Sequence, residues 1–565
     1  MKAYTLIGLA ALVVACGNSA VNKPSPTSVL TKDGVVAGAI VVDMKDNVSQ
    51  SDIDDLSKIA GTELHADNDT ARKYKYEEGV VNVADEDAIL EKLNADPRVE
   101  HAEKVVEYKA LFTPNDELYK DQWGLKRAGA ESSYNMSCGQ GVVVAVVDTG
   151  IACLHDDNTK GIDDLPTCQG GYNFISNNSN AADDNGHGSH CAGTIAQLTN
   201  NNHGGAGLAP CVKLMPVKVL SGSGSGSMES VAEGIRFAAD NGANVISLSL
   251  GSSHPSDIVK DAVDYAHDKG VVIVAAAGNS GGSVGYPAAY PNAIAVSAMD
   301  ANDRIANFSS RGPQVAISAP GVNILQQTIC EGSDGTDGCG EFKAFNGTSM
   351  ATPHVSAAAA LVVAQGITDP DAVRAKLQST ADPKKEPNLY GAGILRADSA
   401  VKSTILSHTA LKLVALFGFI FLMRKKIDKS LLKSKPAMLG IVLGGFGLVP
   451  LFFTGLMPHL GNFRVVAEVL ARPIGEWNIP LGFAYKYLPL ANFIPAGLAT
   501  VLLLKNKFGR LFAGGLAVGS AALCMQLAFS GEMTFILGSM LMKVWMLVNV
   551  IVLGYFAKAT LTKEA

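Results

Sequence analysis

Asn346-Gly347-Thr348-Ser349-Met350-Ala351-Thr352-Pro353-His354 is the stretch that decides the fold. It places a serine among small residues, directly before the apolar run 355–363. The pattern predicts a helix that begins near Ser349 and leaves its hydroxyl exposed. The N–H groups and partial positive charge of a helix N-terminus stabilise an oxyanion formed beside such a hydroxyl. A nucleophilic serine needs a base, and the base needs an orienting carboxylate.

Two upstream segments offer these partners. Asp148 follows the apolar, mostly β-branched run 142–147, which predicts a strand buried on both faces. The carboxyl end of such a strand is where open α/β sheets hold their functional groups. His187 lies in Asn185-Gly186-His187-Gly188-Ser189 and opens a predicted helix. Singly, Asp148 and Ser349 are also typical of turns and helix caps, and His187 of a loop.

The order Asp148, His187, Ser349 is one of the three chain orders known for this triad chemistry. With Ala275-Ala276-Ala277-Gly278-Asn279-Ser280 as a fourth block, residues from about 115 to 397 resemble a subtilisin-family (subtilase) serine endopeptidase. The resemblance implies an α/β fold with a subtilisin-like, mostly parallel sheet flanked by helices. It also implies that Asn279 and the Ser349 N–H form an oxyanion hole, and that catalysis needs no cofactor. His190 and His354 are interpreted as structural neighbours.

The resemblance extends to substrate binding. It implies an S1 pocket with Ser249-Leu250-Gly251 on one wall, Ala276-Ala277-Gly278 on the other and Gly285 at the floor. Because Gly285 leaves room and no acidic residue is evident there, we expect a preference for bulky apolar P1 residues. Gly224-Ser225-Gly226 resembles the edge strand that pairs with an extended substrate, although 221–227 is also typical of a flexible linker.

Structural calcium is a further expectation from the family. Asp116, Asp157 and Asn200 occupy positions that resemble one calcium site and offer the oxygen ligands the ion prefers. They are equally typical of solvated turns. The chain has nine cysteines. Cys330 with Cys339 and Cys153 with Cys168 bracket loops, the family topology implies Cys138 with Cys211, and Cys191 is left free.

The N-terminal region predicts export. Residues 1–15 read as a lipoprotein-type signal peptide, because Val13-Val14-Ala15-Cys16-Gly17 resembles a lipobox and would make Cys16 the lipidated first residue. Ordinary signal cleavage with Cys16 incidental is the alternative. Residues 16–34 form a polar tether. The net charge of −7 argues against a nucleic-acid partner.

The pattern of residues 35–109 predicts a small ferredoxin-like α+β domain of order β-α-β-β-α-β. Strands are expected near 36–42 and 99–106, a strand pair or edge strand near 76–83, and helices near 51–59 and 85–93. It resembles the inhibitory propeptide of the family, which would make the chain a self-processing zymogen. A passive spacer is the alternative. Cleavage is expected between Tyr108 and Thr113.

The catalytic domain is assigned to 110–402, and 403–565 is predicted to be an all-α membrane domain of about five transmembrane helices, with four or six as alternatives. Basic clusters in alternate loops place the protease on the extracytoplasmic (periplasmic) side of a bacterial cell membrane, multi-pass and with a possible lipid anchor at Cys16. Arg472 and Glu476 belong to a predicted external loop, interpreted as solvated or as a partner site. The expected spans are 406–423, 437–456, 488–504, 511–529 and 533–555.

These observations favour a membrane-tethered serine endopeptidase that hydrolyses extracytoplasmic proteins or peptides. The expected partners are those substrates, the chain's own propeptide as inhibitor and membrane lipid. A membrane sensor or scaffold whose protease domain only binds peptides or matures itself is the alternative class.

Overall fold

The computed structural model describes residues 35–66, 69–106, 113–153, 161–428, 430–447, 469, 472–473, 476, 493–503, 505–530 and 538–562. The chain divides into two compact units, Met1–Leu111 and Phe112–Ala565. Cys16, Asp157 and residues 108–112 of the predicted cleavage region therefore lie outside the described residues.

The first unit is a three-stranded antiparallel sheet with helices. Its elements are β1 (Val35–Met44), α2 (Gln50–Ala60), α3 (Asp69–Tyr74), β2 (Tyr76–Val80), α4 (Glu86–Asn94) and β3 (Val99–Val106), with strand order β2-β1-β3. Ser49 and Asp52 form a capping box that starts α2. Ile40, Leu56 and Leu93 share its separate core. The predicted elements are present, but a single bridge from His65 to Glu78 stands where the expected order needs a fourth strand.

The second unit is built on a seven-stranded parallel sheet of order β10-β9-β8-β7-β4-β6-β5. The runs of Val, Ile and Ala in its central strands are typical of parallel strands covered on both faces. This arrangement confirms the predicted subtilisin-like α/β fold. The strands are β4 (Val143–Asp148), β5 (Tyr172–Asn173), β6 (Lys213–Lys218), β7 (Val245–Leu248), β8 (Val272–Ala276), β9 (Ala293–Met299) and β10 (Val315–Pro320).

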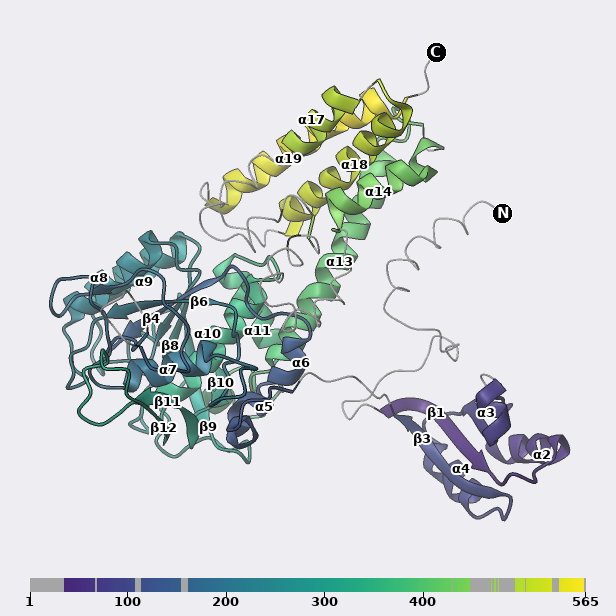
Figure 1. Cartoon of the computed structure of the whole chain (residues 1–565), viewed down its shortest axis with the longest axis horizontal. Helices are drawn as coiled ribbons and strands as arrows, with labels where there is room; N and C mark the ends of the chain where they lie inside the picture. The colour runs from purple at the N-terminus through teal and green to yellow at the C-terminus, as the bar shows by residue number, and fades with distance from the viewer. Residues whose placement is uncertain are drawn as a thin grey trace. The chain divides into compact units, whose positions relative to one another are not determined.

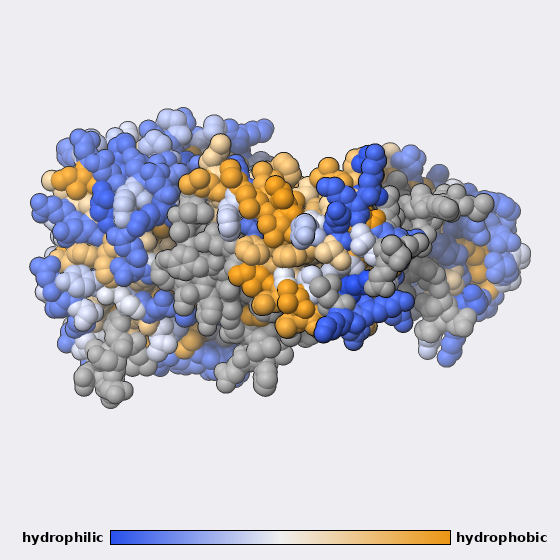
Figure 2. Space-filling model, turned by 90° about the horizontal axis from the view of Figure 1, so that it is seen from above, coloured by the Kyte–Doolittle hydropathy of each residue, from blue (hydrophilic) through white to orange (hydrophobic). Residues whose placement is uncertain are grey.

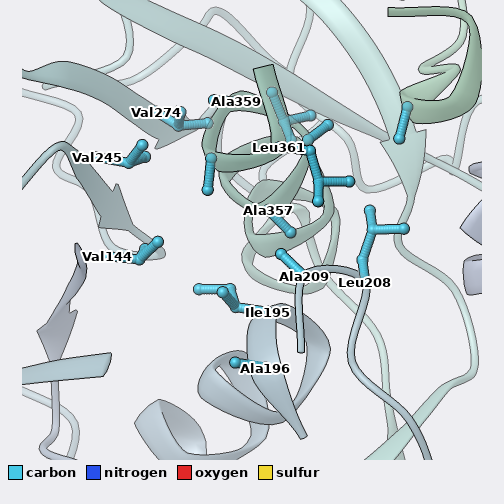
Figure 3. Packing of buried hydrophobic residues seen from close by; sticks show 14 of the residues in the cluster. Val144, Ile195, Ala196, Leu208, Ala209, Val245, Val274, Ala357, Ala359 and Leu361 are labelled. Atoms are coloured by element: carbon cyan, nitrogen blue, oxygen red, sulfur yellow. The ribbon is translucent and has the colours of Figure 1, made fainter. Parts of the chain in front are cut away.

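Successive residues of β4 alternate between two hydrophobic cores. Val143 and Val147 pack with α8 (Met228–Asp240) and α9 (Asp257–Asp268) on one face of the sheet (Figure 1). Val144 and Val146 pack on the other face with α7 (His187–Ala196), α10 (Thr348–Val363) and α11 (Pro370–Ser379). Figure 3 shows this second core, where Val144, Val245 and Val274 of three strands face Ile195 of α7 and Ala357 of α10.

Shorter elements complete the protease part. They are η1 (Tyr119–Asp121), α5 (Trp123–Arg127), α6 (Ala130–Tyr134), the antiparallel pair β11 (Ile324–Ile329) and β12 (Gly340–Phe345), and α12 (Pro387–Tyr390). Three disulfides join Cys138 to Cys211, Cys153 to Cys168 and Cys330 to Cys339, which confirms the three expected pairings. Cys191 is a buried free thiol, also as predicted.

One helix belongs to both the protease and the apolar C-terminal region. Helix α13 (Ala397–Leu422) packs Ala397, Ala400 and Val401 into the protease core. Its later residues Leu416 and Phe419 join a separate apolar cluster with the C-terminal helices. The predicted domain boundary at residue 402 therefore falls inside a continuous helix.

The C-terminal helices form a bundle. They are η2 (Leu431–Lys433), α14 (Lys435–Gly445), α17 (Phe493–Leu503), α18 (Lys507–Ser530) and α19 (Gly538–Thr560). Glycines let α14 and α18 approach closely, because a Cβ on Gly440 or Gly515 would lie within 2.2 Å of the other helix's carbonyl oxygens. Among the described residues, α13, α18 and 540–560 of α19 are long and apolar enough to cross a membrane.

Large apolar side chains also face outward from this bundle. Val414 of α13, Val501 of α17 and Ile551 of α19 are among those that are mostly exposed. Figure 2 shows exposed apolar surface of this kind in orange. The count of five spans stays a prediction, because most of 448–492 lies outside the described residues.

Arg472 and Glu476 are buried, which is at odds with a solvated loop. Glu476 Oε1 forms an ion pair with Lys412 Nζ of α13, with the two atoms 2.7 Å apart. Arg472 Nη2 donates to the carbonyl of Ala364, at the C-terminal end of α10. A charge leaves water only when it is paired, so the two residues dock against the protein instead of facing solvent.

Candidate active site

Asp148 ends β4 at the carboxyl edge of the sheet and is fully buried. Its Oδ1 accepts the Thr149 N–H at 2.7 Å and contacts His187 Nδ1 at 2.7 Å. A short contact between an imidazole nitrogen and a carboxylate is a charge-assisted hydrogen bond. The structure thus joins two of the three predicted triad residues, which stand 39 positions apart in the chain.

His187 is the first residue of α7 and is held there by Asp183. The Asp183 carboxylate accepts the N–H groups of Gly186 and Ser189 at 2.9 and 2.8 Å, and the Thr149 hydroxyl at 2.8 Å. The helix also approaches the turn after β4 closely, since a Cβ on Gly188 would lie 2.1 Å from the Gly150 carbonyl oxygen. Only glycine fits at that contact.

Ser349 is the second residue of α10, after Gly347 and Thr348. Its Oγ donates to the Ser249 carbonyl at 3.1 Å, and its own carbonyl accepts the Ser249 hydroxyl at 2.8 Å. In this state the Ser349 hydroxyl therefore donates its proton to Ser249 and not to His187. The hydroxyl can rotate, and catalytic hydrogen bonds of this kind often form only with substrate bound. His187, Asn279 and Ser349 line one hollow of about 400 Å³.

Two N–H donors converge beside Ser349. The Asn279 side-chain oxygen accepts the Thr348 N–H at 2.8 Å and the Thr348 hydroxyl at 2.9 Å, which turns its amide nitrogen the other way. A Cβ built on Gly347 would lie 3.4 Å from Asn279 Nδ2 and 3.5 Å from Ser349 N. Both nitrogens thus lie beside Gly347 and near the Ser349 side chain, where an oxyanion hole needs its donors.

The histidines of this region differ in electrostatics. Burial lowers the pKa of His187, but the charge and hydrogen bond of Asp148 raise it by more, so that pKa lies above the ordinary value of 6.5. Burial lowers the pKa of His190 to about 3 and that of His354 to about 4. His190 Nε2 lies 3.0 Å from the Ile324 carbonyl and His354 Nδ1 lies 2.9 Å from the Met350 carbonyl. These two rings are neutral structural neighbours.

The predicted substrate residues fall into two groups. A second hollow of about 400 Å³ borders His187 and is lined in part by Gly224, Ser225, Gly226, Ser249, Leu250 and Gly251. The other predicted residues lie at the end of β8. Ala276 is the last residue of this strand, and Ala277 and Gly278 follow it. The Gly285 N–H donates to the Ala277 carbonyl at 2.9 Å. Gly285 also lies close to the residue that follows Gly251, because a Cβ built on Gly285 would lie 2.9 Å from the Ser252 carbonyl oxygen.

The predicted calcium residues are only partly described. Asp116 is buried, and burial raises the pKa of its carboxyl. Its two oxygens accept the backbone N–H groups of Asn200 and Asn201 at 2.8 and 3.1 Å. Asn200 thus lies beside Asp116, whose carboxylate accepts its backbone N–H. Calcium at Asp116, Asp157 and Asn200 stays a prediction.

Sequence reasoning missed two buried charged residues of the site. Asp183 anchors the His187 helix, and Lys218 closes β6 with its ammonium group among backbone carbonyls. A lysine directly after the apolar run 214–217 was the available signal for Lys218.

Comparison with known proteins agrees with this geometry. Residues 139–393 match the sequence model of the Subtilase family. The chain is 37% identical over 379 residues to a thermophilic serine proteinase of Bacillus sp. (strain AK1), an alignment that covers 66% of this chain and 90% of that protein. Subtilisin Savinase of Lederbergia lenta is 44% identical over 283 residues, covering 50% and 98%. Thermitase of Thermoactinomyces vulgaris is 41% identical over 294 residues, covering 52% and 100%.

The chain belongs to the subtilase family and is a serine-type endopeptidase. Its C-terminal bundle lies outside the residues that match the family model.

Proposed function

We propose that this chain is a membrane-held serine endopeptidase in which Asp148, His187 and Ser349 hydrolyse peptide bonds of extracytoplasmic proteins. The observation that carries the proposal is the 2.7 Å contact between Asp148 and His187 beside the hollow that His187 shares with Ser349 and Asn279. A base, a nucleophile and oxyanion donors then surround one volume, which is the arrangement that acyl transfer requires.

The proposed mechanism follows from the hydrogen bonds. With Nδ1 donating to Asp148, His187 keeps Nε2 as the acceptor for the Ser349 proton. The Ser349 oxygen attacks the peptide carbonyl, and the carbonyl oxygen gains negative charge beside Ser349 N and Asn279 Nδ2. His187 then gives the proton to the leaving amine, and water repeats the steps on the acyl-enzyme.

Substrate binding is proposed to use both groups of residues beside the triad. An extended chain would pair with 224–226 and place its P1 side chain between 249–251 and 276–278, above Gly285. The groups that face Gly285 are the carbonyls of Ser252 and Ala277, which offer no charge to a cationic P1 residue. A bulky apolar P1 residue therefore fits this site best.

The first unit is proposed to be the inhibitory propeptide of a zymogen. Its separate hydrophobic core supports an element that could be released by one cut without unfolding the protease. The described residues end at 106 in this unit and resume at 113, so the proposed cut between Tyr108 and Thr113 falls in the connection.

The C-terminal helices are proposed to cross a bacterial cell membrane, with the protease outside and Cys16 as a lipid anchor. The exposed apolar residues on α13, α17 and α19 support a lipid environment, because water would penalise such a surface. Arg424, Lys425 and Lys426 follow α13 directly, as expected if this span ends in the cytoplasm.

The test compares Ser349→Ala with Ser356→Ala on the same helix, using purified full-length protein and an unlabelled protein substrate. Ser356 is buried and donates to Ser247 Oγ at 2.9 Å, so its loss should cost about 1 kcal/mol of stability and leave turnover intact. We expect Ser349→Ala to lose peptide cleavage by a factor of roughly 10³ or more. Cleavage by Ser349→Ala at the wild-type rate would refute the assignment.

A further inference from the structure

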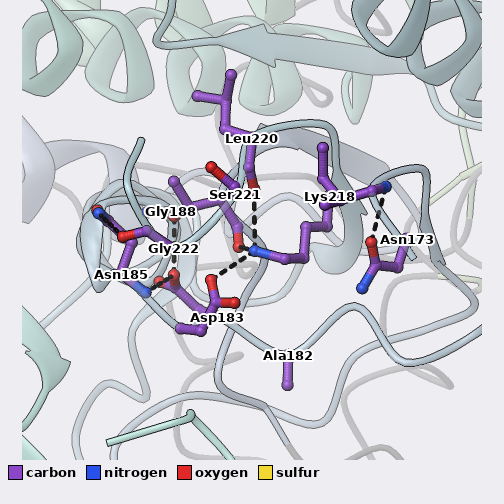
Figure 4. A network of polar contacts seen from close by, with 12 residues as sticks. Asn173, Ala182, Asp183, Asn185, Gly188, Lys218, Leu220, Ser221 and Gly222 are labelled. Carbon is purple, nitrogen blue, oxygen red and sulfur yellow. Dashed lines mark hydrogen bonds and ion pairs between the residues drawn. The ribbon is translucent and has the colours of Figure 1, made fainter. Parts of the chain in front are cut away.

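A buried lysine connects the parts of the site that bind substrate to the parts that perform the chemistry. Lys218 ends β6, and its side chain is almost fully buried. Its ammonium group has three N–H donors and three acceptors: the Thr149 carbonyl at 2.6 Å, Asp184 Oδ1 at 2.6 Å and the Leu220 carbonyl at 2.9 Å. Figure 4 shows this network around Lys218 and Leu220.

Each acceptor belongs to a different part of the active site. Thr149 follows the triad carboxylate and donates its N–H to Asp148 Oδ1. Asp184 precedes the helix that starts with His187 and lies next to Asp183, the anchor of that helix. Leu220 begins residues 220–226, which we name the substrate segment because Leu220 and 224–226 line the hollow beside His187.

The substrate segment has two further ties to the triad. The Asp148 carbonyl accepts the N–H groups of Val219 and Leu220 at 2.9 and 3.1 Å. Asn185 Nδ2 donates to the Gly222 carbonyl at 2.8 Å. The Lys218 ammonium group adds charged contacts to these neutral ones. A charge-assisted hydrogen bond is roughly twice as strong as a neutral one.

We propose that Lys218 is a positioning residue that holds the substrate segment in register with Asp148 and His187, and so determines how well an extended peptide is used. The inference rests on the proposed function of the triad and of residues 224–226. Without the ammonium group, the Leu220 and Thr149 carbonyls lose their common donor, and the segment can shift against the triad. Such a shift would weaken the binding of an extended substrate, which pairs with the segment. A substrate that occupies only the S1 pocket would not contact the segment.

The decisive variant is Lys218→Met, which keeps most of the apolar stem and removes the charge. Its matched control is Lys213→Met, at the exposed start of the same strand. Each protein is assayed with a tetrapeptide amide and with a single-residue ester that carry the same P1 side chain. Active-site titration with a fluorophosphonate corrects every rate for the fraction of folded enzyme.

We expect Lys218→Met to lower kcat/KM for the tetrapeptide by about 10-fold or more, mainly through KM, and that for the ester by less than about 3-fold. Lys213→Met should behave as wild type with both substrates. An equal loss with both substrates would show a merely structural role, and no loss with either would show that the contacts are dispensable. Both results would overturn the proposal.

Asp184→Asn provides a second test if Lys218→Met fails to fold. Asp184 is partly exposed, and asparagine keeps an oxygen acceptor while it removes the charge. We expect the same selective loss for the tetrapeptide, at a smaller size of about 3-fold. If the ratio of kcat/KM for the tetrapeptide to kcat/KM for the ester were the same in Asp184→Asn and wild type, the proposal would be contradicted. Failure of the proposed function would look different, because Ser349→Ala would then cleave both substrates.

Discussion

Helices α10 and α19 are both apolar along most of their length, yet the protein covers them very differently. Of the 16 residues of α10, all described, 15 are buried and Ser349 is the exception. In α19, by contrast, Met540 is 76% exposed and Ile551 is 73% exposed. Helix α10 lies inside the protease and presents only its N-terminal end to a hollow. Helix α19 packs against α18 and α17 and leaves large apolar side chains such as Ile551 exposed.

The difference teaches that an apolar helix gains its role from what surrounds it. Strands, α7 and α13 enclose α10, so its side faces serve the fold and its one accessible hydroxyl is available for chemistry. No comparable layer covers the outer side of α19 among the described residues, which is why we propose a lipid environment for this side. Changes to the side of α10, the end of α10 and the side of α19 should therefore have separable effects.

A charge on the side of α10 should have the largest effect. Ala359→Asp would bury an unpaired carboxylate at a position with no exposure, at a cost of about 4 kcal/mol or more, which approaches the whole stability of a typical domain. We expect loss of folded protease, measured as loss of active-site labelling and rapid degradation by added trypsin. Normal labelling of Ala359→Asp would break the comparison.

A change beside the N-terminal end of α10 should remove chemistry and spare the fold. Asn279→Ala deletes the side-chain donor beside Ser349 N and should lower kcat by about 10²–10³-fold with little change in KM. Asn302→Ala, at an exposed position, is the control and should match wild type. If both variants had the same kcat, the assigned oxyanion hole would be wrong.

A charge on the side of α19 should affect membrane attachment and little else. Ile551→Asp places a carboxylate near the middle of the apolar stretch 540–560 of α19 and should cost about 3 kcal/mol on insertion. We expect a larger fraction of the protein to be released from membranes by alkaline carbonate, while kcat on a soluble peptide stays unchanged. Release equal to wild type would argue that lipid does not cover this side.

The smallest effect concerns pH and the base beside the end of α10. Asp148 holds the pKa of His187 above 6.5, and only the neutral imidazole can accept the Ser349 proton. Activity should therefore fall as pH decreases through that raised pKa, so that the acid limb of kcat/KM has its midpoint above 6.5. A midpoint below 6.5 in a steady-state pH profile would contradict the assigned pair.

The sequence was most informative where function depends on local pattern. Asp148 was visible as a carboxylate after a β-branched run, and Ser349 as a serine before an apolar run; the structure places each at the end of its element. The mostly parallel sheet was implied by the family resemblance, and the structure shows it with seven strands. Two disulfides were predictable because each pair brackets a loop, and the third, Cys138 with Cys211, was implied by the family topology.

Contacts between distant residues were not visible in the same way. Lys218 meets Thr149 across 69 positions, and Arg472 meets Ala364 across 108, so neither contact leaves a local pattern. The predicted domain boundary at residue 402 falls inside α13 for another reason. Its first turns are amphipathic and its later turns uniformly apolar, and this change of composition suggested a domain border where one helix continues. The rotated Ser349 hydroxyl depends on side-chain geometry that no sequence records.

The most direct test of the central claim is to treat the mature, propeptide-free enzyme with a fluorophosphonate and locate the adduct by peptide mass spectrometry. Because His187, oriented by Asp148, activates only the hydroxyl beside it, we expect one phosphonylated residue, Ser349. Labelling should also weaken at pH values below the pKa of His187. An adduct on another serine, or active enzyme that resists labelling, would contradict the account.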